Sequence, residues 1–104
     1  MVAQEVELAD DMKSRMIGLM GKPSFPEGRT LLIEKCNWIH TFFMKFPIDV
    51  IYVNKELVVK KVKRNISPWR FPGPVLSATS VFELSAGQIK ENSIEIGDQL
   101  YVGT

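Results

Sequence analysis

Ile48-Asp-Val-Ile-Tyr-Val53 is the stretch that decides the fold class, because it is a continuous run dominated by β-branched and aromatic residues. Asn54-Lys-Glu56 follows it as a turn, and residues 57–66 predict a strand that pairs back onto it as a hairpin. Under the two-residue period of a strand, Asp49 shares a face with Ile51 and Val53. An acid on an apolar face needs a partner, so Asp49 is either half of a buried ion pair or a functional carboxylate.

Shorter signals of the same kind lie on both sides of this hairpin. They predict strands over residues 2–9, 30–33, 38–43, 77–84 and 99–102, and two short helices over residues 12–20 and 86–92. Residues 67–74 contain three prolines and predict a stiff loop. Closely spaced strands without β-α-β alternation predict a mainly β (β-rich α+β) fold, in which an antiparallel or mixed sheet forms a small, partly closed barrel with two short helices.

Length and composition indicate a single domain over residues 1–104, with 45% hydrophobic and 24% charged residues. The net charge of +1 gives no global attraction to nucleic acid or to a membrane. The basic run at residues 60–64 divides between the two faces of a strand and is typical of a solvated edge. No stretch resembles a signal peptide or a membrane span, so we expect a cytoplasmic protein without nucleic-acid or membrane partners.

One cysteine and one histidine carry the reactive chemistry of the chain. His40 is the best candidate acid or base, with Asp49 to orient it, and the alternative is a structural histidine bonded to the backbone. Cys36 could be a nucleophile beside His40 only in a helix, where the two would lie ~6 Å apart, whereas a strand separates them by ~13 Å. A buried free cysteine is the alternative. One residue of each type is too few for a closed zinc site, so we expect no metal and no cofactor.

A second set of candidates lies in the proline-rich loop. Trp69 and Arg70 could hold a ligand by stacking and charge, although Trp69 could equally cover one end of the barrel. The candidate ligand-binding residues are Arg15, His40, Lys45, Asp49, Trp69 and Arg70.

Three functions fit these candidates. The first is a binding module for a small polar or anionic ligand, such as a sugar or carboxylate, held around the segments His40–Asp49 and Trp69–Arg70. The second is an enzyme that uses His40 with Asp49. The third is a protein-interaction domain in which exposed aromatic side chains, Trp38 and Trp69, contact a partner.

Four blocks in a fixed order resemble the domain of unknown function 192 (DUF192) family. They are Arg15-Met-Ile-Gly-Leu-Met20, His40-Thr-Phe-Phe-Met-Lys-Phe-Pro-Ile-Asp49, Pro68-Trp-Arg70, and Phe82-Glu-Leu-Ser-Ala-Gly87 followed by Ile96-Gly-Asp98. The resemblance covers nearly the whole chain and implies a compact, mainly β fold without an assigned activity. The chain departs from the family pattern at Ser85, where proline is frequent, and over residues 22–27.

Overall fold

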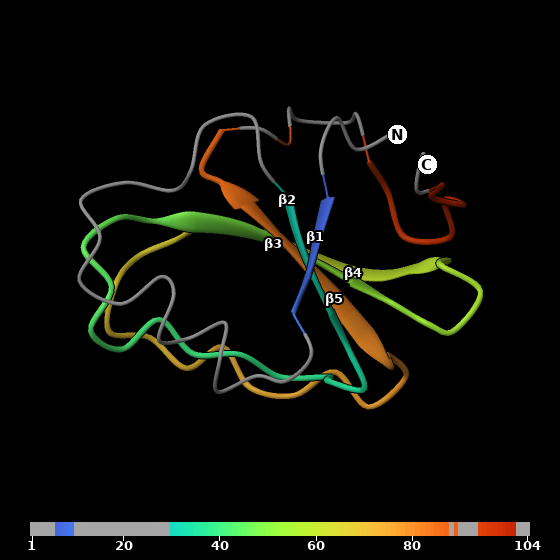
Figure 1. Ribbon diagram of the computed structural model, residues 1–104, viewed down its shortest axis with the longest axis horizontal. Coiled ribbons are helices and arrows are strands. Elements are labelled where there is room, and N and C mark those ends of the chain that lie inside the picture. Colours follow the sequence, from blue (N-terminus) through green and yellow to red (C-terminus); the bar gives the residue numbers. More distant parts are fainter. Residues whose placement is uncertain (1–5, 10–29, 88, 90–93, 102–104) are drawn as a thin grey trace.

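The computed structural model describes residues 6–9, 30–87, 89 and 94–101. Five strands within these residues form one mixed, mainly antiparallel sheet (Figure 1). Its strands are β1 (Val6–Ala9), β2 (Thr30–Glu34), β3 (Ile48–Val53), β4 (Val59–Ile66) and β5 (Ser80–Ser85). The order across the sheet is β1-β2-β5-β3-β4, and only the β1–β2 pair is parallel. The predicted mainly β fold and the β3–β4 hairpin are confirmed.

The predicted barrel and helices are not confirmed. The described sheet is open, with β1 and β4 at its two edges. The first predicted helix, over residues 12–20, lies outside the described residues, and at the start of the second, Ala86 and Gly87 form a turn. Within the described part of the chain, no helix has the length and apolarity that a membrane span requires.

The prediction of a strand over residues 38–43 is wrong, because this segment runs beside the proline-rich loop without forming a ladder. The two segments share only scattered backbone hydrogen bonds, such as Val75 N–H to Asn37 C=O and Thr41 N–H to Arg70 C=O, each 2.9 Å. Three prolines in the loop lack the N–H group that a continuous ladder needs. The predicted strand over residues 99–102 is likewise reduced, in its described part, to an isolated bridge between Val58 and Gln99.

Strand β3 is buried along its whole length, because hydrophobic clusters cover both of its faces. Ile48, Val50 and Tyr52 pack under the loops of residues 36–46 and 75–78. Ile51 and Val53 pack on the other face, with β5 and the C-terminal residues Ile94 and Leu100. This double burial explains why the sequence of β3 is nearly continuous in apolar residues instead of alternating.

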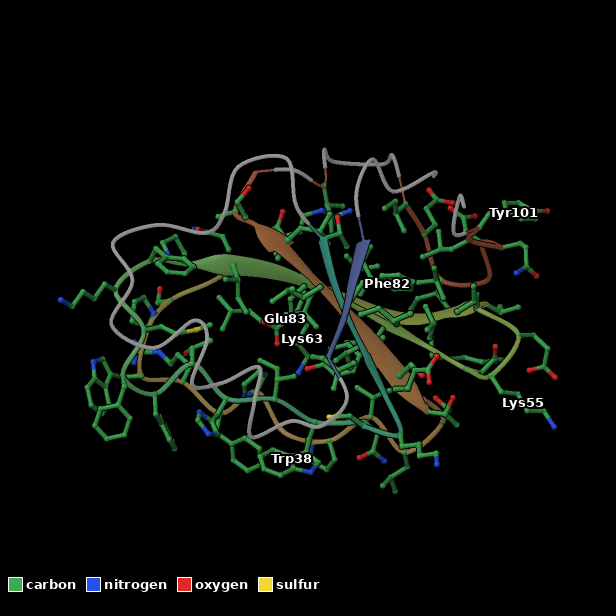
Figure 2. All side chains as sticks on the ribbon, in the orientation of Figure 1. Trp38, Lys55, Lys63, Phe82, Glu83 and Tyr101 are labelled. Carbon is green, nitrogen blue, oxygen red and sulfur yellow. The ribbon has the colours of Figure 1, made fainter. Side chains whose placement is uncertain are left out.

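A second acid, Glu83 of β5, is also completely buried, near the middle of the molecule (Figure 2). It pairs with Val50 and Leu31 across the sheet, so it shares a face with the larger cluster of Ile48, Val50 and Tyr52. A carboxylate in such surroundings requires hydrogen bonds or an opposite charge. Nothing in the spacing of the sequence around Glu83 indicates this burial.

Tyr52 provides a prediction about alkaline pH. Burial, followed by the charge of Cys36 nearby, raises its pKa to about 12. Because this folded-state value exceeds the value of about 10 in an unfolded chain, the free energy of unfolding keeps its full value below pH 10, where the phenol is protonated in both states. The free energy of unfolding then falls by on the order of 2–3 kcal/mol as the pH rises from about 10 through 12, because the unfolded chain loses this proton more readily than the folded one.

Alkaline denaturation of the parent and a Tyr52→Phe variant, followed by circular dichroism, measures this effect. In the described part of the chain the Tyr52 hydroxyl has no hydrogen-bond partner, so the variant should be at least as stable near neutral pH. It should also lose stability less steeply between about pH 10 and 12. Identical pH profiles for the two proteins would contradict the assignment.

Candidate functional site

Asp49 is anchored by the backbone of two other segments. Its side chain is 1% exposed, and its carboxylate accepts hydrogen bonds from the N–H groups of Asn65 at 2.8 Å, Gly87 at 3.1 Å and Ile89 at 3.0 Å. The ion pair or the contact with His40 that the sequence predicts for this carboxylate is thus replaced, in these bonds, by three backbone donors. Asp49 joins β3 to the end of β4 and to the turn after β5.

The hydrogen bond to Asn65 follows from a bulge in β4. The pairing of β3 with β4 changes register between Ile48 and Val50, which leaves an additional residue in β4. Asn65 has a φ angle of 54°, a left-handed conformation that asparagine tolerates better than most residues. The N–H group displaced from the ladder is then bonded by Asp49.

His40 lies in the loop before β3, within a row of aromatic rings. Its Nδ1 accepts a hydrogen bond from the N–H of Phe42 at 3.2 Å, which places the proton of the neutral ring on Nε2. The imidazole stacks on Phe42, with 4.7 Å between ring centroids and 23° between planes. Cys36, which lies a few residues before His40 in the sequence, is buried, and its thiol donates to the carbonyl of Trp38 at 2.8 Å.

Thr41 fastens the proline-rich loop to the His40 segment. This residue is completely buried, and its hydroxyl donates to the C=O of Ser67 at 2.7 Å and accepts from the N–H of Arg70 at 2.8 Å. Its own N–H donates to the C=O of Arg70, and its C=O accepts from the N–H of Trp69, both at 2.9 Å. Trp69 and Arg70 are therefore placed beside the His40 segment by one threonine.

These contacts create a surface that we call the aromatic face, composed of Trp38, His40, Phe42, Phe43, Trp69 and Phe71. Successive ring centroids from Phe71 through Trp38, His40, Phe42 and Trp69 to Phe43 lie 5.7, 6.2, 4.7, 6.2 and 4.7 Å apart. Four of the six residues are exposed, Phe42 by 37%, Phe43 by 58%, and Trp69 and Phe71 by 55% each. A contiguous exposed aromatic surface of this kind typically marks an interaction site.

Two residues of the aromatic face have an unfavourable backbone conformation. Phe43 and Trp69 have φ angles of 65° and 64°, in the left-handed region that bulky residues rarely adopt. Their rings contact each other across the two loops, with 4.7 Å between centroids. Strained conformations of this kind concentrate at functional sites.

The loops that form the aromatic face carry only positive charge. Residues 36–47 and 67–79 contain Lys45 and Arg70, both exposed, and no aspartate or glutamate. Arg70 lies between two aromatic residues of the face, Trp69 and Phe71, and Lys45 follows Phe43 by two residues. The remaining predicted cation, Arg15, lies outside the described residues.

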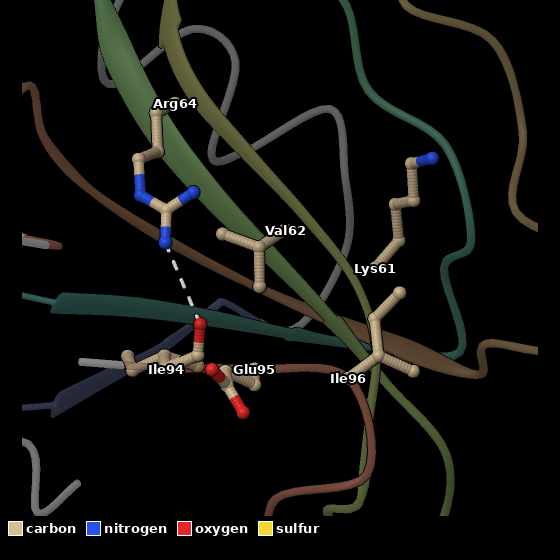
Figure 3. Close-up of a pocket in the computed structure, with 6 residues that line it drawn as sticks. All are labelled: Lys61, Val62, Arg64, Ile94, Glu95 and Ile96. Atoms are coloured by element: carbon tan, nitrogen blue, oxygen red, sulfur yellow. Dashed lines mark hydrogen bonds between the residues drawn. The ribbon is translucent and has the colours of Figure 1, made fainter. Parts of the chain in front are cut away.

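Two surface hollows lie away from these residues. One, of about 440 Å³, is formed where β4 meets the segment 94–96, and there Arg64 donates to the carbonyl of Ile94 (Figure 3). The other, of about 320 Å³, lies between the end of β2, the β3–β4 turn and the start of β5. Neither contains a predicted site residue. Among the described residues, no three His, Cys, Asp or Glu side chains group as metal ligands would.

The structure thus brings His40, Trp69 and the backbone of Arg70 to one place and anchors Asp49 in another network. Sequence patterns give no signal for Thr41, because a buried threonine in a loop has no periodicity. The density of aromatic residues over 38–46, together with three prolines over 67–74, was the available signal for the aromatic face. It did not indicate that the two segments meet.

Comparison with known proteins agrees with this architecture. The model of the DUF192 family, described as "Uncharacterized ACR", matches residues 2–102. A UPF0127 protein of Pyrococcus furiosus is 39% identical over 101 residues, which cover 92% of this chain and 84% of that protein.

Two crystal structures share the fold. A Sinorhizobium meliloti protein described as a candidate transcription regulator has a TM-score of 0.73 at 22% identity, covering 90% of this chain and 78% of that one. A protein of unknown function from Novosphingobium aromaticivorans has a TM-score of 0.70 at 20% identity, covering 90% of this chain and 71% of that one. At these identities the likeness concerns the fold alone.

Proposed function

We propose that this chain, which belongs to the DUF192 family, is a binding module that holds an anionic ligand on its aromatic face. The proposed ligand-binding residues are His40, Lys45, Trp69 and Arg70, which are four of the six candidates from the sequence. Phe42, Phe43 and Phe71 extend the surface.

The observation that carries the proposal is the combination of exposure and strain at Phe43 and Trp69. A left-handed conformation costs a bulky residue on the order of 1 kcal/mol or more, and glycine or asparagine would remove most of that cost. More than half of each side chain is exposed, so burial stabilises the fold little. Fold stability therefore does not explain two aromatic residues here, whereas a ligand that covers their rings does.

The charge of the loops determines the ligand class. Arg70 offers a planar guanidinium that can bind a carboxylate through two parallel hydrogen bonds, and the adjacent rings provide apolar surface. Because the two loops contain no acid, they present no like charge to an anion. Sugar acids and other carboxylates with an apolar or ring-shaped part match this surface.

The anchoring of Asp49 supports binding over acid–base catalysis. An Asp49 carboxylate that orients His40 would need to hydrogen-bond the imidazole, and its three observed bonds join it to backbone N–H groups of other segments. In this proposal Asp49 therefore stabilises the fold, and His40 is part of the aromatic face that binds the ligand.

A Trp69→Asn variant tests the proposal, because asparagine accepts the left-handed backbone and lacks the ring. We expect its melting temperature to stay close to that of the parent, while its affinity for anionic probes such as glucuronate or citrate falls at least about tenfold. Chemical-shift perturbation in heteronuclear NMR spectra measures the affinity and locates the contact.

The matched control is Tyr101→Asn, which removes another exposed aromatic ring, 64% exposed and distant from Trp38 in Figure 2. The control should bind the probes like the parent. Equal binding by the Trp69→Asn variant, or binding of neutral sugars as tight as that of their acids, would show that the aromatic face is not an anion-binding surface.

A further inference from the structure

We infer that the anionic ligand of the aromatic face is an extended peptide segment of a partner protein, with apolar side chains and one or two carboxylates. This inference rests on the proposed function and identifies its ligand. It makes a docking surface of the loops 36–47 and 67–79, with a partner defined by its charge and its apolar content.

The aromatic face is larger than the area that a single small ligand can cover. Five successive ring contacts connect Phe71 to Phe43, each with 4.7–6.2 Å between centroids. One sugar or small carboxylate covers one or two rings and would leave the exposed remainder in water. An extended peptide advances ~3.3–3.6 Å per residue, so about six to eight residues follow the whole row.

The number of cations favours a peptide over a single-stranded nucleic acid. A nucleic acid carries a negative charge on every nucleotide, and its affinity depends on many Lys and Arg contacts along the backbone. The loops of the aromatic face supply two cations, Lys45 and Arg70, and the net charge of the chain is +1. Two cations balance the one or two carboxylates of a short peptide.

The arrangement of the rings also favours a peptide over a single-stranded nucleic acid. Nucleotide bases bind by stacking on free aromatic faces, but the facing planes of His40 and Phe42 already stack on each other. Trp38 and Phe71 meet edge to face at 82°. A surface of partly paired rings suits the irregular aliphatic and aromatic side chains of a peptide, which pack against ring edges as well as faces.

The aromatic face is also rigid enough to bind a flexible segment at low entropic cost. Pro68, Pro72 and Pro74 restrict the loop, and Thr41 bonds it to the His40 segment. A preformed surface leaves only the peptide to be ordered on binding. Tryptophan and arginine, adjacent here as Trp69 and Arg70, are the residues most enriched among the energetically dominant positions of protein interfaces.

Selection of random peptides of about eight residues, displayed on phage, against the immobilised full chain tests this inference. We expect selected peptides to be enriched in aspartate or glutamate together with Leu, Ile, Phe or Trp. Synthetic copies should bind the Trp69→Asn and Arg70→Glu variants at least about tenfold more weakly than the parent. The matched control for charge is Lys55→Glu, in the exposed β3–β4 turn distant from Trp38, which should bind like the parent (Figure 2).

The outcomes separate the inference from the proposed function. If no acidic apolar peptide is enriched, while glucuronate, citrate or a single-stranded oligothymidylate of about eight nucleotides binds in a Trp69-dependent way, the peptide inference is wrong and the proposed function stands. Selected peptides that lack acids, or that bind the Arg70→Glu variant as well as the parent, also overturn the inference. Selected peptides and small anions that all bind the Trp69→Asn variant like the parent overturn both.

Discussion

Asp49→Ala is expected to lower the free energy of unfolding by about 3–5 kcal/mol, a large part of the 5–15 kcal/mol typical of a domain. The substitution removes an acceptor that bonds the N–H groups of Asn65, Gly87 and Ile89. A hydrogen bond to a charged group contributes about 1.5–3 kcal/mol, and a buried N–H group left without a partner costs a similar amount. The three losses are not additive, because the segments can partly relax.

Urea denaturation of Asp49→Ala and of a matched control, Asp98→Ala, measures this difference. Asp98 is an exposed aspartate whose carboxylate accepts one local hydrogen bond, from the N–H of Glu95 at 2.9 Å. We expect Asp98→Ala to cost less than about 1 kcal/mol, since its donor can turn to water. If Asp49→Ala were no more destabilising than Asp98→Ala, the carboxylate would not be structural, and a catalytic or ligand-binding role would have to be considered again.

Thr41→Val is expected to cost about 2–3 kcal/mol and to weaken binding at the aromatic face. Valine has nearly the same shape, so the change removes the hydroxyl and leaves the C=O of Ser67 and the N–H of Arg70 without that partner. The loop that carries Trp69 and Arg70 then loses its side-chain attachment. Both stability and affinity should fall, because the same two bonds position the loop and stabilise it.

Thr41→Ser provides the matched control, since serine retains the hydroxyl and loses one methyl group. Thr41→Ser should keep the parent NMR resonance of the Trp69 indole N–H and its affinity for anionic probes, whereas Thr41→Val should shift the resonance and bind at least about fivefold more weakly. Parent-like affinity in Thr41→Val would mean that the loop is positioned by its prolines and backbone contacts alone.

Several parts of this fold follow from local sequence. The β-branched run of β3 and the turn after it predict the hairpin with β4, because backbone sterics favour such residues in strands and the turn is short. The face shared by Asp49, Ile51 and Val53 is also correct, since the period of two is a property of any strand. The prediction of a strand failed at residues 38–43. Aromatic residues have high strand propensity there, but the neighbouring proline-rich loop lacks the N–H donors that a continuous ladder needs.

The sequence by itself determined that this chain is mainly β, that residues 48–53 form a strand and that Asp49 needs a partner. Only the tertiary structure decided which partners Asp49 has, because Asn65, Gly87 and Ile89 lie 16, 38 and 40 residues away. The same holds for the aromatic face, whose two loops are joined through Thr41 across 26 to 29 residues. Side-chain periodicity fixes which face of a strand a residue occupies, but the order β1-β2-β5-β3-β4 fixes which strand ends and loops become neighbours.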